Sequence, residues 1–94
     1  MENILIVDDE KHYPMIIGEI LQEEGYQAFT APSGMEALDI LNTQLIDLVL
    51  TDVKMPGMTG IDLLEKIKEL KPDMPVIIMT AFGSVEKAVE AMHK

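Results

Sequence analysis

The chain contains no cysteine and no arginine, and it has no long uninterrupted hydrophobic run. Without cysteine it can form neither disulfide bonds nor metal sites with thiolate ligands. Its apolar runs are far shorter than the roughly 20 residues that a helix needs to span a bilayer, so we expect no membrane association. A strand pattern follows the first three residues directly, which is not the layout of a signal peptide. These absences favour a soluble cytoplasmic protein.

Positive charge is also scarce. Seven lysines stand against 17 aspartates and glutamates, and the formal net charge is −10 at pH 7. We therefore expect no direct binding of nucleic acid by this domain, because such binding needs a cationic surface that displaces phosphate counterions. The excess of acidic residues instead fits a partner with basic patches, or a bound cation.

Strands and helices are predicted to alternate along the chain. The 94 residues fit one domain, and 48% of them are hydrophobic, which is enough for a packed interior. Apolar runs predict strands at residues 4–7, 27–31, 47–51 and 76–79, of which 27–31 reads as an edge strand. Helical spacing predicts four helices with the apolar stripes Tyr13, Ile16, Ile17, Ile20 and Leu21; Ala37, Leu38 and Leu41; Ile61, Leu64 and Ile67; and Val85, Ala88, Val89 and Met92. This alternation predicts an α/β fold, a doubly wound parallel sheet with helices on both faces.

Four polar residues follow the predicted strands. Asp8 and Asp9 follow the first strand, Asp52 the third and Thr80 the fourth. Sites in such folds lie outside the carboxyl ends of the strands, so we expect these residues to converge at one edge of the sheet. Three carboxylates in one cleft repel one another, and they must bind protons or recruit a cation. Oxygen ligands without histidine or cysteine nearby suit Mg²⁺, or Mn²⁺.

An aspartate beside Mg²⁺ can act as a nucleophile and form an acyl phosphate. Asp52 is the candidate nucleophile, and the hydroxyl of Thr80 could bond a phosphoryl oxygen on it. The helix predicted to start at Ser84 would add the positive end of its dipole nearby. A structural role is the alternative, in which Asp8 and Asp9 cap the first helix and Asp52 caps the loop before the third.

Three segments carry a family resemblance: ILIVDDE at 4–10, DLVLTDVKMPGMTG at 47–60 and PVIIMTAFG at 75–83. In this order and spacing they resemble the receiver domains of bacterial two-component response regulators, over residues 3–94. The stretch 80–92 also resembles, less specifically, receivers that precede sigma-54-dependent activator domains. The resemblance implies a flavodoxin-like fold with the strand order 2-1-3-4-5.

The resemblance also implies a role for each residue at the strand ends. Asp52 would be the phosphoacceptor, Thr80 the switch hydroxyl, and the backbone N–H of Ala81 a donor to the phosphoryl group. Lys54 and Phe82 match positions that tune hydrolysis of the acyl phosphate. The Mg²⁺ ligands would be Asp9, Asp52 and the backbone carbonyl of Lys54, with Asp8 acting directly or through water.

The implied function is a phosphorylation switch that catalyses only its own phosphorylation and dephosphorylation and is otherwise not an enzyme. A sensor histidine kinase would supply the phosphoryl group, and the fourth helix would pass the signal to an output domain, expected to be transcriptional. A Mg²⁺-dependent phosphohydrolase is an alternative, but its signature pairs two acids one residue apart, and Lys54 stands where the second acid would follow Asp52. An interaction module that works without phosphorylation is a third interpretation.

The C-terminus departs from the family pattern. Receivers have a fifth strand ending in a lysine and then a fifth helix, whereas this sequence ends at Lys94 within the predicted fourth helix. We therefore predict the strand order 2-1-3-4, without the fifth strand and helix, and an incomplete receiver domain over residues 1–94. The apolar strand 76–79 would then be an open edge, which favours aggregation. We expect that a longer chain completes the domain, or that two chains pair through this strand or the fourth helix.

Overall fold

The computed structural model describes residues 2–79 of the chain. None of the helices in this range combines the length and the apolar character that crossing a membrane requires. The elements in chain order are β1 (Asn3–Val7), α1 (His12–Glu23), β2 (Gln27–Ala31), α2 (Gly34–Thr43), β3 (Leu48–Asp52), α3 (Gly60–Leu70) and β4 (Val76–Met79). The predicted strands are confirmed to within one residue. The third runs one residue later than predicted, so that Asp52 is its last residue. The predicted fourth helix lies outside the described residues.

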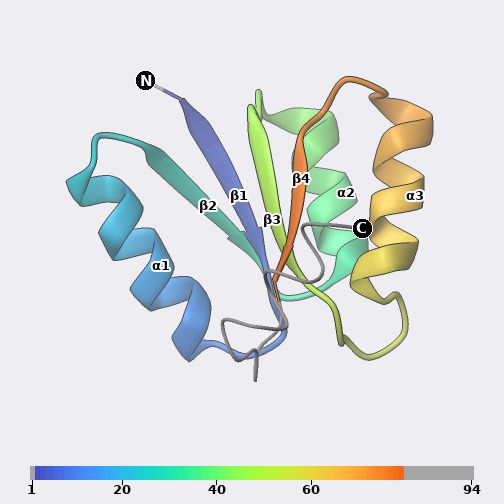
Figure 1. The fold of residues 1–94 in the computed structure, drawn as a ribbon, viewed down its shortest axis with the longest axis horizontal. Helices are drawn as coiled ribbons and strands as arrows, with labels where there is room; N and C mark the ends of the chain where they lie inside the picture. The colour runs from blue at the N-terminus through green and yellow to red at the C-terminus, as the bar shows by residue number, and fades with distance from the viewer. Residues whose placement is uncertain (1, 80–94) are drawn as a thin grey trace.

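The four strands form one parallel sheet in the order β2-β1-β3-β4. The strand order reverses between β1 and β3, because the chain first builds β2 on one side of β1 and then crosses to the other side. In Figure 1, α1 covers one face of the sheet, and α2 and α3 cover the opposite face. This arrangement confirms the predicted doubly wound α/β fold, with β2 at one edge and β4 at the other among the described strands.

The main core lies between the sheet and the helices α2 and α3. Leu5, Val7 and Val49 of the two central strands are fully buried there, together with Leu63 and Ile67 of α3. Leu5 and Val7 share this face because alternate side chains of a strand point to the same side. Burying each such aliphatic side chain stabilises the fold by about 1.5–3 kcal/mol, so this layer holds β1 and β3 firmly in place.

The buried face of α3 differs from the predicted one. Leu63 is fully buried, whereas Ile61 is 46% exposed and Leu64 is only partly buried. The cause is Gly60, which begins the helix and packs so closely on β3 that a Cβ there would overlap the carbonyl oxygen of Asp52. Because residues three and seven positions later lie on the same side of a helix, Gly60 directs Leu63 and Ile67 to the core.

The outer face of α1 is more exposed than its predicted apolar stripe implied. Ile16 and Ile20 are each 55% exposed, and the buried residues of this helix are Pro14 and Gly18. A Cβ at Gly18 would lie 3.7 Å from the Cβ of Ala28, so the helix packs on β2 through its small residues. The larger side chains of the predicted stripe are therefore exposed or half-buried. Within residues 2–79, α1 is the only helix on this face of the sheet (Figure 1).

Candidate functional site

The carboxyl ends of β1 and β3 lie next to each other at one edge of the sheet (Figure 1). Val7 pairs with Thr51, and the following residues, Asp8 and Asp52, therefore stand at the same level. Asp9 comes next in the chain. Each of the three aspartates has a carboxylate oxygen within 4.8 Å of those of the other two. The structure thus brings together the three acidic residues that the sequence predicted to converge.

The three aspartates differ in burial. Asp8 and Asp52 are 5% and 3% exposed, whereas Asp9 is open to solvent. The backbone N–H of Glu10 donates to Asp8 Oδ1 at 2.9 Å, and the N–H of Val53 donates to Asp52 Oδ1 at 2.8 Å. Among the hydrogen bonds within residues 2–79, each buried carboxylate has this one backbone donor. The remaining carboxylate oxygens of the cluster can therefore accept a proton or bind a cation.

The electrostatics of the cluster are most evident at Asp8. Burial raises its pKa, because the charged form loses hydration, and the N–H of Glu10 partly opposes this rise. The charges of Asp52 and Asp9 raise the pKa further. A cation between the carboxylates would relieve both burial and repulsion, and an oxygen-only ligand set fits a hard divalent ion such as Mg²⁺.

Helix capping does not explain the three aspartates. The N-cap of α1 is Lys11, and no side-chain cap bond is formed there. The N-cap of α3 is Thr59, whose hydroxyl accepts the N–H of Asp62 while its own N–H donates to the Asp62 carboxylate. Asp52 therefore does not cap the helix that follows it. Within the described residues, the cluster makes no contribution to a helix terminus that would account for its position.

The loop between β3 and α3 completes one wall of the site. A surface cavity there is lined by Asp9, Lys54, Met55, Pro56 and Thr59. The loop turns at Gly57, which has a positive φ of 77°, and it closes through a 2.9 Å bond from the Gly60 N–H to the Val53 carbonyl. Lys54, whose carbonyl was predicted as a metal ligand, thus lines the same cavity as Asp9.

Thr80, Ala81 and Phe82, predicted as the switch hydroxyl, the phosphoryl donor and a tuning residue, lie outside the described residues. The strand that leads to them ends beside the site. Met79 pairs with Asp52, and its carbonyl accepts the N–H of Val53 at 2.9 Å. The end of β4 is therefore level with the aspartate cluster.

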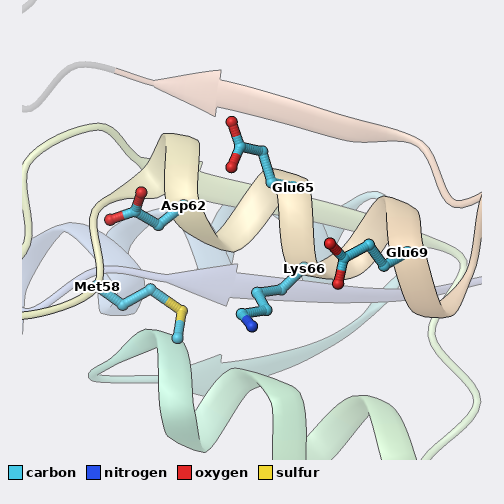
Figure 2. Close-up of a pocket in the computed structure, with 5 residues that line it drawn as sticks. All are labelled: Met58, Asp62, Glu65, Lys66 and Glu69. Atoms are coloured by element: carbon cyan, nitrogen blue, oxygen red, sulfur yellow. The ribbon is translucent and has the colours of Figure 1, made fainter.

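A second surface cavity lies along α3. Its lining residues are Met58, Asp62, Glu65, Lys66 and Glu69. Figure 2 shows Met58 and Lys66 extending toward the neighbouring helix α2. The carboxylates of this cavity are all exposed to solvent. Exposed charges on one helix face are ordinarily hydrated, so the buried aspartates, and not this cavity, are the candidate site.

One contact at the site was not predicted from the sequence, namely the bond from the Glu10 backbone to Asp8. Every residue except proline has a backbone N–H, so the residue type does not show which N–H will donate to Asp8. The available signal was the position of Glu10, an acidic residue two places before the start of α1, where the helix N-terminus favours negative charge. Its carboxylate accepts hydrogen bonds from the backbone and the ring of His12, and these bonds lower the pKa of Glu10.

Known sequences give a consistent comparison. Residues 4–94 match the family described as the response regulator receiver domain. Over 90 residues, the chain is 44% identical to sporulation initiation phosphotransferase F of Bacillus subtilis (strain 168), covering 96% of this chain and 73% of that protein. It is 48% identical over 90 residues to the transcriptional regulatory protein ZraR of Escherichia coli (strain K12), covering 96% of this chain and 20% of ZraR. The chain thus spans most of one relative and about a fifth of the other.

Solved structures agree with this comparison. The response regulator protein TrrA of Thermotoga maritima in complex with Mg²⁺-BeF is similar with a TM-score of 0.84 and 37% identity, covering 98% of this chain and 80% of that one. A complex of the histidine kinase ThkA with TrrA is similar with a TM-score of 0.83 and 40% identity, covering 89% and 72% of the two chains.

Proposed function

This chain belongs to the response regulator receiver domain family, and from that premise we propose that Asp52 is the residue that accepts a phosphoryl group. The position of Asp52 carries the proposal. It is the last residue of β3 and is almost wholly buried. One of its carboxylate oxygens lies within 4.8 Å of carboxylate oxygens of Asp8 and Asp9. Burial limits the access of water to an acyl phosphate, which favours a phosphorylated state that lasts long enough to signal.

We propose further that Asp8, Asp9, Asp52 and the backbone carbonyl of Lys54 hold Mg²⁺, for which Mn²⁺ can substitute. The oxygen-only ligand set supports a hard divalent cation, and so does the raised pKa of Asp8. The similar structure of TrrA contains Mg²⁺-BeF. When bound, the ion would offset negative charge on the carboxylates and on the phosphoryl oxygens.

Asp52 acts as the nucleophile in the proposed transfer. Its Oδ1 accepts the N–H of Val53, which leaves Oδ2 to attack the phosphorus of a phosphohistidine. The new O–P bond forms as the P–N bond breaks, and the departing ring nitrogen takes up a proton. The charge of Asp52 and its fixed orientation at the strand end prepare the in-line geometry that such a transfer needs.

We propose a sensor histidine kinase as the phosphoryl donor and, in a longer protein, a transcriptional output domain as the receiver of the signal. The ThkA–TrrA complex supports the first partner, and the regulator ZraR, of which this chain spans 20%, supports the second. In this proposal Thr80, Ala81 and the fourth helix respond to the phosphoryl group, and Lys54 and Phe82 tune its hydrolysis. The switch would operate in the cytoplasm, as a monomer or as a dimer through the fourth helix or β4.

Replacing the nucleophile tests the proposal. Incubated with a small phosphodonor and Mg²⁺, the parent chain should gain the mass of one phosphoryl group, and Asp52→Asn should gain none. Asp39→Asn is the matched control, because Asp39 is an exposed aspartate on α2. The control should be phosphorylated like the parent. Full phosphorylation of Asp52→Asn would reject the assignment.

A further inference from the structure

The segment between β1 and α1 contains a chain of hydrogen bonds to which the proposed phosphoryl transfer assigns no role. At one end, the N–H of Glu10 donates to Asp8 Oδ1 at 2.9 Å. At the other, Glu10 Oε1 accepts the backbone N–H of His12 at 3.1 Å and lies 2.7 Å from His12 Nδ1. The backbone and the side chain of one residue therefore connect the buried carboxylate to the first residue of α1.

The carboxylate of Glu10 accepts a hydrogen bond from the backbone N–H of His12, the first residue of α1. Lys11, the N-cap, has no side-chain cap bond, and the early N–H groups of a helix need acceptors from outside it. Glu10 supplies one from the position before the N-cap. Its side chain is about half exposed and that of His12 is largely exposed, so hydrogen bonds rather than packing hold this turn.

We infer that Glu10 is a positioning residue for the proposed cation site. Because its side chain is anchored on His12, its own backbone is restrained, and its N–H points at Asp8 Oδ1. That bond restrains the Asp8 carboxylate, one oxygen of which lies within 4.8 Å of carboxylate oxygens of Asp9 and Asp52, and it leaves Oδ2 without this backbone donor. The inference rests on the proposed function, since it assumes that the cluster binds Mg²⁺.

Two other effects of Glu10 must be separated from positioning. Its negative charge, two residues along the chain from Asp8, could attract a cation at a distance. Its cap bond also stabilises α1, so its removal could weaken binding by loosening the fold. A charge effect disappears in Glu10→Gln, whereas the amide oxygen of glutamine can still accept both bonds from His12. If lower fold stability alone weakens Mg²⁺ binding, removing the cap of another helix should weaken binding by the same factor.

The experiment measures Mg²⁺ affinity by NMR titration of the protein with MgCl₂. Groups that hold a metal ligand in place commonly contribute 10–100-fold to affinity, and we expect a loss of about tenfold in Glu10→Ala. Glu10→Gln should bind within about twofold of the parent, since it keeps the acceptor. Ser33→Ala is the control, because the Ser33 hydroxyl accepts the Glu36 N–H at the start of α2. Its removal takes one acceptor from the N-terminus of a helix, as Glu10→Ala does, but at a helix other than α1. It should leave the affinity unchanged.

A readout without metal accompanies the titration. The amide proton of residue 10 should exchange faster with solvent in Glu10→Ala than in the parent and in Glu10→Gln. Parent-like affinity in Glu10→Ala would overturn the inference, and so would an equal loss in Glu10→Gln or in Ser33→Ala. A parent chain that binds no Mg²⁺ would reject the cation site of the proposed function. Parent binding with no effect of Glu10 would reject the positioning role alone.

Discussion

At the scale of single residues, the site places carboxylates where water is scarce. Asp8 and Asp52 are almost wholly buried, next to each other and to Asp9. Each buried carboxylate keeps one backbone N–H donor, which orients it without neutralising it. The arrangement is costly without a cation, and this cost should be measurable.

Asp8→Asn should stabilise the metal-free chain at neutral pH. The folded pKa of Asp8 lies above its usual 3.8, mainly because of burial, so the folded state holds this proton more tightly than the unfolded state does. Stability is therefore lost as the pH rises from about 3.8 through the folded pKa. Asparagine carries no charge and avoids this loss.

Urea denaturation of the parent and Asp8→Asn between pH 3 and pH 7, in chelator, measures the effect. The stability gained by the mutant should grow with pH, and it should vanish below the usual pKa of Asp8. With Mg²⁺ present the gain should shrink, because the parent alone keeps the full ligand set. A gain independent of pH would mean that the ionisation of Asp8 does not destabilise the fold.

The sequence predicted the acidic cluster because strand ends can be located from apolar runs, and because the carboxyl ends of parallel strands meet at one edge. It did not predict the role of Glu10. The bond to Asp8 comes from a backbone N–H, and its direction depends on how the turn before α1 is held. Residue types alone do not encode such a contact.

At the scale of secondary structure, Gly60 fixes how α3 packs against β3, the strand that ends at Asp52. It begins α3 in direct contact with the backbone of Asp52, and its N–H donates to the Val53 carbonyl. The apolar pattern predicted the existence of α3 but not its buried face, because the pattern Ile61, Leu63, Leu64 allows more than one orientation. The close approach of Gly60 to β3 selects Leu63 as the buried residue.

Gly60→Ala should therefore destabilise the chain and disturb Asp52. The new Cβ would overlap the carbonyl oxygen of Asp52, a rigid backbone atom, and overpacking of this kind typically costs about 1–3 kcal/mol. Gly34→Ala is the matched control, because a Cβ there would meet only side-chain atoms of Met58, the nearest being Sδ at 2.6 Å, and this flexible side chain can move. Urea denaturation should show that Gly60→Ala lowers the free energy of unfolding clearly more than Gly34→Ala does. Equal losses would show that contact with Asp52 is not the constraint.

At the scale of the whole molecule, acidic charge dominates. The formal net charge of −10 and the cluster at the strand ends act in the same direction, since both favour binding of a cation. The alternation of strands and helices was enough to predict the doubly wound sheet. The apolar stripe of α1 was predicted, but a sequence pattern does not state how much of each side chain in it other elements cover.

Mg²⁺ should raise the thermal stability of the whole chain, and Asp9→Ala should remove most of this gain. A ligand that binds the folded state alone stabilises it by about 2.7 kcal/mol at a concentration of 100 times its Kd. Asp9 is exposed, so its replacement should change the metal-free stability little. Thermal melts with chelator and with MgCl₂ measure both quantities. If Asp9→Ala responds to Mg²⁺ as strongly as the parent, the ion binds elsewhere.

Asp52, and no other carboxylate of the cluster, should carry the phosphoryl group. Borohydride reduction of the phosphorylated chain converts an acyl phosphate to an alcohol, and peptide sequencing by mass spectrometry locates the modified residue. We predict that the modification is at Asp52 and depends on Mg²⁺. Modification at Asp8 or Asp9 with Asp52 unmodified would contradict it.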